Sequence, residues 1–199
     1  MAIHYVVTTY EKLLTTIGLL CTVISAQSFA ESGYTLDPKL SNVTFATIKK
    51  QFVVEPASIK PSSGGLTEDG KFSIVLDLKS ISTGVSIRDQ RLNELYFESM
   101  NFPEVKISGS VEPSLLTGKP QKTTIAAEVT LHGVTKTIDF PVMVVPSDGF
   151  VMVNSTSTII INGADFGIST DNLNKLSATV GGLALSDKVP LNFNLMFDK

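Results

Sequence analysis

The sequence predicts an all-β domain behind an export signal, and three observations lead to this prediction. Apolar and polar residues alternate along several segments after residue 30, as in strands with one buried face. Gly, Pro and Asp gather between those segments, where tight turns belong. The composition is that of a globular chain, with 43% hydrophobic and 18% charged residues among 199. We therefore expect one antiparallel β domain over residues 31–199.

The first thirty residues are typical of a signal peptide. Leu13–Ile24 suits its apolar core, and Ser28–Ala30 places small residues at the two positions that a signal peptidase reads. A membrane-spanning helix needs roughly twenty apolar residues, and this run is shorter and interrupted by Thr and Ser. An uncleaved anchor is the alternative, and His4 and Lys12 supply little of the expected positive charge. Cleavage after residue 30 would leave a periplasmic protein without stable membrane insertion, and the true start codon stays open.

The only cysteine, Cys21, lies within that apolar run. The domain after residue 30 therefore has no thiol and no disulfide. Leu20 stands where lipid attachment at Cys21 would require a small residue, which argues against a lipoprotein.

The strands are expected in chain order wherever the period-two pattern holds. Alternation is clearest in five segments: Lys71–Lys79, Val105–Val111, Ile125–Leu131, Val134–Val144 and Val189–Phe197. It is weaker in three more: Asn42–Ile48, Phe52–Ile59 and Phe150–Ile161. Turn residues mark the connections at Pro61–Gly65, Asp69-Gly70, Gly118–Pro120, His132-Gly133 and Ser147–Gly149. About eight strands result, which suits either a sandwich or a closed barrel.

One segment, Ser86–Ser99, has helical spacing instead. Ser86 and Asp89 are arranged as a capping box, and Leu92 and Tyr96 fall on one helical face. Pro103 would end this helix, which we expect to cover one end of the β structure. A second short helix is plausible at residues 171–178.

The sequence offers little catalytic chemistry. The mature part has one histidine, His132, in an expected turn that favours a solvated side chain over a base or a ligand. A metal site would need carboxylates almost alone, and no nucleophile elbow or phosphate loop appears. The net charge of −3, without a Lys/Arg run, argues against nucleic acid and anionic membranes as partners. We predict no enzyme activity, no cofactor and no metal.

Several motifs, in order and spacing over residues 34–197, resemble the YceI family of exported, lipocalin-like proteins. They are Tyr34–Asp37, Ser41–Phe45, Gly64–Leu66, Ser80–Gly84, Ile87–Asp89, Phe97, Phe102-Pro103, Leu131–Lys136 and Asp165–Ile168. The resemblance implies an eight-stranded antiparallel barrel with one short helical segment near one end. It also implies an apolar tunnel for a polyisoprenoid or another long-chain amphiphile, such as a prenylated quinone or a prenyl diphosphate.

Inward rows of the strands would line that tunnel, for which an eight-stranded barrel has the right size. The candidate lining residues are Phe45, Phe72, Ile74, Leu76, Phe97, Phe102, Val129, Leu131, Phe140, Val142, Phe166, Leu191 and Phe193. Arg88 and Arg91 are candidates for holding a head group, or else they form a solvated helix face that pairs with Asp89 or Glu94. The segment Lys49–Pro56 departs from the family pattern, and we expect Pro56 to interrupt pairing.

Three functions compete at this point. The first is non-catalytic transport or sequestration of an isoprenoid-type lipid in the bacterial periplasm, favoured by a continuous apolar tunnel. The second is an envelope interaction module with a packed interior, favoured by Phe rings that meet across the axis. The third is a lipid enzyme, which would need His132 or paired carboxylates inside the cavity. The sequence does not decide whether the protein forms a homodimer.

Overall fold

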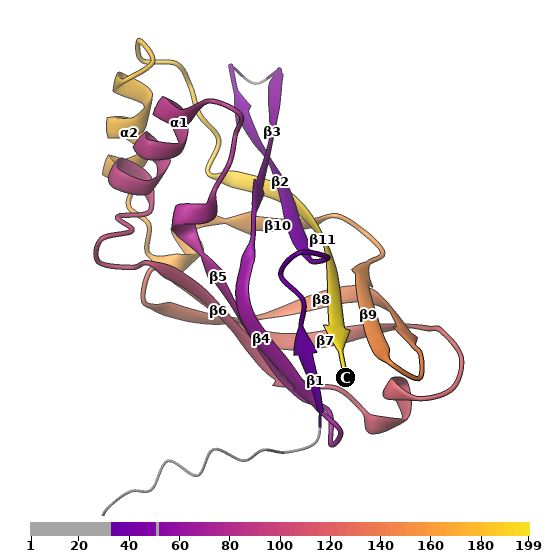
Figure 1. Cartoon of the computed structure of the whole chain (residues 1–199). Helices are drawn as coiled ribbons and strands as arrows, with labels where there is room; N and C mark the ends of the chain where they lie inside the picture. The colour runs from indigo at the N-terminus through magenta and orange to yellow at the C-terminus, as the bar shows by residue number, and fades with distance from the viewer. Residues whose placement is uncertain (1–32, 51) are drawn as a thin grey trace, which may run out of the picture. The chain divides into compact units, whose positions relative to one another are not determined.

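The computed structural model describes residues 33–50 and 52–199, so the expected signal peptide lies outside the described residues. Eleven strand segments and two α-helices make up this part of the chain (Figure 1). The strands are β1 (Gly33–Leu36), β2 (Asn42–Lys49), β3 (Val53–Ile59), β4 (Pro61–Thr67), β5 (Lys71–Asp77), β6 (Glu104–Ser110), β7 (Gln121–Leu131), β8 (Val134–Pro146), β9 (Phe150–Ser155), β10 (Ile159–Asn162) and β11 (Lys188–Asp198). The helices are α1 (Ser86–Arg91), continued by a π-helical turn η2 (Leu92–Tyr96), and α2 (Thr170–Ala178). Three 3-10 turns complete the set: η1 (Leu78–Ser80), η3 (Pro113–Leu116) and η4 (Gly163–Phe166).

Eight strands close into an antiparallel barrel. The hydrogen-bonded order is β1, β4, β5, β6, β7, β8, β9 and β11, and β1 pairs back onto β11 through Leu36 and Phe197. Closure leaves no free edge around this ring. The barrel, one of the two architectures left open by the alternation, is confirmed.

The three remaining segments continue ring strands beyond irregular breaks. β2 lies on the same side of β11 as β1, where Phe45 pairs with Leu191. β3 pairs with β2 as β4 pairs with β1, and β10 follows β9 along the opposite side of β11. The expected single strand Phe150–Ile161 is thus divided into β9 and β10.

Two local predictions about the first strands are wrong. Pro61–Gly65 is not a turn but most of β4, and Gly64 permits this because a β-carbon there would crowd the Ser73 carbonyl and the Leu36 side chain. Pro56 does not interrupt pairing: it lies opposite Ala46 in an unbroken β2–β3 register. Among the described residues β3 has no second ladder, so Pro56 occupies an edge position, which proline tolerates.

Two helices, rather than the one expected from the resemblance, lie beside each other at one end of the barrel (Figure 1). The segment α1–η2 ends before Pro103 as expected, but the predicted capping box does not form. Val85 is the N-cap residue, and the Asp89 carboxylate instead accepts hydrogen bonds from Thr83, at 2.8 Å from its amide nitrogen and 2.5 Å from its hydroxyl. We call α1, η2 and α2 the helical cap.

A polar cluster ties the helical cap to the β7–β8 hairpin. Glu98 follows η2, and its Oε2 accepts hydrogen bonds from His132 Nε2 and from Asn172 Nδ2 of α2, both at 3.0 Å. His132 and Gly133 both have positive φ, as a two-residue hairpin turn requires, so this turn is confirmed. The His132 side chain is only 12% exposed, however, so the expected solvated histidine is wrong. We call Glu98, His132 and Asn172 the cap latch.

Candidate functional site

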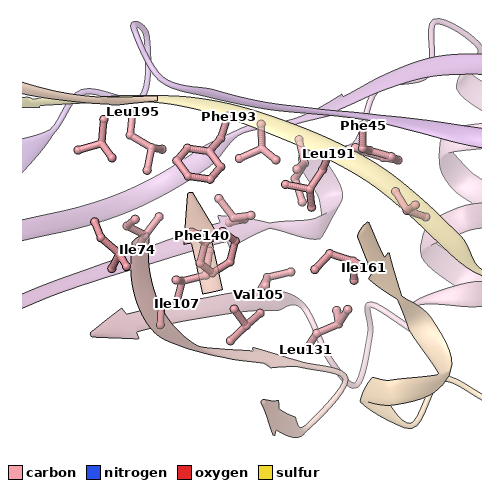
Figure 2. Close-up of a pocket in the computed structure, with 18 of the residues that line it drawn as sticks. Phe45, Ile74, Val105, Ile107, Leu131, Phe140, Ile161, Leu191, Phe193 and Leu195 are labelled. Atoms are coloured by element: carbon pink, nitrogen blue, oxygen red, sulfur yellow. The ribbon is translucent and has the colours of Figure 1, made fainter. Parts of the chain in front are cut away.

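The barrel encloses an apolar cavity of about 210 Å³. Figure 2 shows side chains from several strands converging on it, with Leu195 and Ile74 toward one end and Phe45 and Ile161 toward the other. The cause is the period-two alternation, because every second residue of a barrel strand faces inward. Tyr96 and Asp187 also line the cavity, but no polar atom of either faces it, so its surface is apolar throughout.

The structure places twelve of the thirteen candidate lining residues in this wall. They are Phe45, Phe72, Ile74, Leu76, Phe97, Val129, Leu131, Phe140, Val142, Phe166, Leu191 and Phe193. Phe102 does not lie there. Its ring packs on His132 instead, with the ring centroids 4.0 Å apart, and so supports the cap latch from outside the cavity.

Several wall residues were not among the candidates. Ile59 ends β3, where the alternation is weak, and Leu66 lies in β4, whose Gly-rich sequence has no alternation to reveal it. The sequence shows that Tyr96 has helical spacing, but it does not show that this side chain reaches the cavity wall. Asp187 has no sequence signal at all, since an acidic residue before a strand normally reads as a turn residue.

Two aromatic rings narrow the middle of the cavity. Phe140 of β8 and Phe193 of β11 meet edge to face, with ring centroids 5.8 Å apart and planes at 70° (Figure 2). Contacts of this kind stabilise by about 0.5–1.5 kcal/mol beyond the burial of the rings. Wall residues lie on both sides of the pair, such as Ile74 and Ile161, so the cavity is constricted rather than divided.

Neither candidate head-group arginine belongs to the cavity wall. Arg88 forms a two-pronged ion pair with Glu55 of β3, with Nη1–Oε2 at 2.9 Å and Nη2–Oε1 at 3.2 Å. Lys49 joins the same carboxylate at 2.8 Å. The hydrogen bond from Lys49, together with the charges of Arg88 and Lys49, lowers the pKa of the Glu55 carboxyl. The expected partners Asp89 and Glu94 are therefore wrong for Arg88, whose fork fastens the helical cap to the β2–β3 hairpin.

Catalytic groups do not gather at the cavity. His132 lies at the tip of the β7–β8 hairpin and outside the wall, which removes the premise of a lipid enzyme built on it. Across residues 33–50 and 52–199, no three His, Cys, Asp or Glu side chains come together in a way that would hold a metal. In the same part of the chain, no helix has the length and apolarity to cross a membrane.

The closed barrel with its cavity and helical cap can be compared with known proteins. The model of the YceI-like domain matches residues 34–197, nearly all of the described chain. This chain belongs to the YceI family. The match confirms the resemblance seen in the ordered motifs, and no curated protein matches the chain.

Solved structures share this fold. A polyisoprenoid-binding domain from Saccharophagus degradans is 27% identical, with a TM-score of 0.78 over 83% of this chain and 97% of that domain. BcnA from Burkholderia cenocepacia is 14% identical, with a TM-score of 0.57 over 81% of this chain and 98% of BcnA. At that identity BcnA supports the fold alone.

Proposed function

We propose that this YceI-family protein binds an isoprenoid-type lipid in its barrel without transforming it, and transports or sequesters that lipid in the bacterial periplasm. The observation that carries the proposal is the continuous apolar wall of the cavity. The likeness to a domain described as polyisoprenoid-binding supports the ligand class. The apolar segment before residue 31 supports export.

The energetics of burial favour a long apolar ligand. Each methylene moved from water into the wall contributes about 0.8 kcal/mol. About ten would contribute about 8 kcal/mol, within the range of about 4–15 kcal/mol that association costs in lost freedom. Affinity should therefore rise with the length of chain that enters, and we expect the Phe140–Phe193 contact to limit that length.

Mass spectrometry of lipids extracted from the protein, expressed from the full chain and purified, tests the proposal. Two neighbouring alanines of β7 supply a matched pair: Ala127 is buried in the wall, and Ala126 is exposed. Ala127→Phe should fill the cavity and reduce the extracted isoprenoid several-fold, whereas Ala126→Phe should leave it unchanged. The mass of the same protein reports whether the N-terminal segment has been removed near residue 30.

The Phe140–Phe193 contact favours a second candidate, an envelope interaction module with a packed interior. This alternative predicts no extractable lipid and no change in thermal stability when isoprenoids are added. Co-purified isoprenoid that Ala127→Phe displaces would rule it out, and its absence from both the wild-type protein and Ala126→Phe would favour it.

A further inference from the structure

Exposed apolar side chains gather at the end of the barrel that carries the helical cap. Nine large hydrophobic residues of the described chain are exposed, and six of them belong to three segments at this end. The segments are the β2–β3 hairpin, the start of α1, and the loop between α2 and β11 (Figure 1). The six residues are Phe52, Val53, Val54, Val85, Ile87 and Val180, which we call the apolar tip. The other three, Leu40, Met100 and Ile160, belong to none of these segments.

Contacts with the β2–β3 hairpin hold the three segments at this end. The ion pair between Glu55 and Arg88 joins β3 to α1. The Lys50 amide donates to the Ala184 carbonyl at 2.9 Å, which places the loop after α2 against the end of β2. The apolar tip is therefore assembled at one place from three parts of the chain.

The hairpin exposes apolar side chains on both of its faces. Successive residues of a strand point to opposite faces, so Val53 and Val54 point in opposite directions, and both are exposed. Phe52, which precedes them, is 86% exposed. A partner protein would cover one face of such a hairpin, whereas a bilayer surrounds an inserted tip on every side. The shape therefore favours a lipid surface over a protein as the occupant.

The charge at this end also suits a membrane. Residues 49–55, 85–91 and 178–186 contain four Lys or Arg and two carboxylates, a net charge of +2, whereas the whole chain carries −3. Both carboxylates, Glu55 and Asp89, already accept hydrogen bonds from groups of the protein. Anionic phospholipids attract basic segments near the membrane surface. The charge that argues against adsorption of the whole protein is thus reversed in sign where the apolar tip lies.

The apolar tip lies at the end of strands that line the cavity. Phe45 of β2 and Ile59 of β3 belong to the cavity wall, and Figure 2 places Phe45 toward one end of it. Four residues of strand, about 13 Å, separate Phe45 from Lys49 at the end of β2. An isoprenoid-type lipid partitions into membranes rather than water. A lipid chain that left a bilayer at the tip would therefore have a short path to the wall.

We propose that the apolar tip inserts reversibly into a phospholipid bilayer, where the protein takes up and releases its lipid. Apolar side chains gain free energy when they leave water. The exposed Lys50 can keep its ammonium among the lipid phosphates while its stem lies along the apolar side chains. This inference rests on the proposed lipid binding and adds the place at which the ligand is exchanged.

A single introduced tryptophan tests the insertion, because the sequence contains none and the emission of an indole reports the polarity around it. Phe52→Trp places the reporter in the apolar tip. Met100→Trp places it outside the tip at an equally exposed residue, 87% against 86%. Protein expressed from the full chain is mixed with vesicles of phosphatidylcholine and phosphatidylglycerol in equal amounts. We expect the emission of Phe52→Trp to shift to shorter wavelength and that of Met100→Trp to stay unchanged.

Sedimentation with the same vesicles measures the strength of the contact. Phe52→Ser combined with Ile87→Ser should lower the partition coefficient at least about tenfold, because two apolar side chains no longer leave water. Met100→Ser combined with Ile160→Ser, at exposed residues outside the tip, is the matched control and should leave it unchanged. All four positions are exposed, so thermal unfolding of both variants should match that of the wild type. Any membrane affinity of the N-terminal segment is common to all variants and cancels in the comparison.

The outcomes separate the two proposals. If neither reporter shifts, or both shift alike, the apolar tip is not a membrane-docking surface, and isoprenoid extracted from the same protein would still support lipid binding. A partner protein as the occupant predicts the first of these results. If Phe52→Trp alone shifts but the protein takes up no geranylgeraniol from vesicles that contain it, lipid binding is overturned while the membrane contact stands.

Discussion

At the scale of single residues, Gly163 has no room for a side chain. A β-carbon there would overlap the Tyr96 hydroxyl, so Gly163→Ala must displace a buried aromatic side chain. Overpacking of this kind costs about 1–3 kcal/mol, and we expect the free energy of unfolding in urea to fall by that amount. Gly149→Ala is the control, since its β-carbon would meet nothing within 4 Å. Adding Tyr96→Phe to Gly163→Ala should recover most of the loss, and no recovery would contradict the assigned clash.

The sequence predicted the position of side chains that lie on regular strands, but not of those that lie outside them. Phe140, Val142 and Leu191 lie on regular strands, where alternation alone assigns each side chain to the inner face. Phe102 precedes Pro103 outside any strand, so no periodicity gives its direction, and it packs on His132. The partner of Arg88 is Glu55, thirty-three positions earlier, a pairing created by tertiary structure alone.

At the scale of elements, the cap latch makes the attachment of the helices dependent on pH. Hydrogen bonds from Asn172 and then from His132 lower the pKa of Glu98 below its ordinary value of 4.5. A carboxyl whose pKa is depressed by folding contributes stability above its unfolded pKa, and loses it as the pH falls through the folded pKa. We therefore expect the unfolding temperature of Glu98→Gln to lie below that of the wild type at pH 7 and to approach it below about pH 4. Glu112→Gln, at an exposed residue before η3, should follow the wild type at every pH.

The helices and strands differed in how well the sequence predicted them. Residues 171–178 were expected to be helical and form most of α2, because Ser169 caps the helix and accepts a hydrogen bond from the Asn172 amide. β1 went unnoticed because four residues are too few to show a period. β4 was mistaken for a turn because Pro and Gly usually break strands, whereas here Gly64 allows three strands to approach closely.

At the scale of the whole molecule, the alternation of apolar and polar residues does not predict whether the sheet closes into a barrel. Sandwiches and barrels both bury every second residue, so the rows of Phe, Ile, Leu and Val suit either. What decides is the pairing of β1 with β11, which joins the two ends of the described chain. Only the resemblance to the YceI family predicted a closed barrel. Closure also turns the inward rows into the wall of one cavity.

If the barrel binds a lipid chain as proposed, the Phe140–Phe193 contact is where we expect the barrel to limit the length of that chain. Phe140→Ala would remove one ring of the edge-to-face pair with Phe193 and join the spaces on either side of it. Truncating a buried Phe costs about 3–5 kcal/mol, and we expect less here because part of the ring already faces a cavity. The wider cavity should retain longer isoprenoid chains than the wild type, as measured by the chain-length distribution of extracted lipid. Met100→Ala, at a residue that is 87% exposed, should change neither stability nor that distribution. Phe140→Ala removes the one contact between aromatic rings that lies across the described cavity. If the chain-length distribution of the extracted lipid is then unchanged, the two rings do not set the chain length.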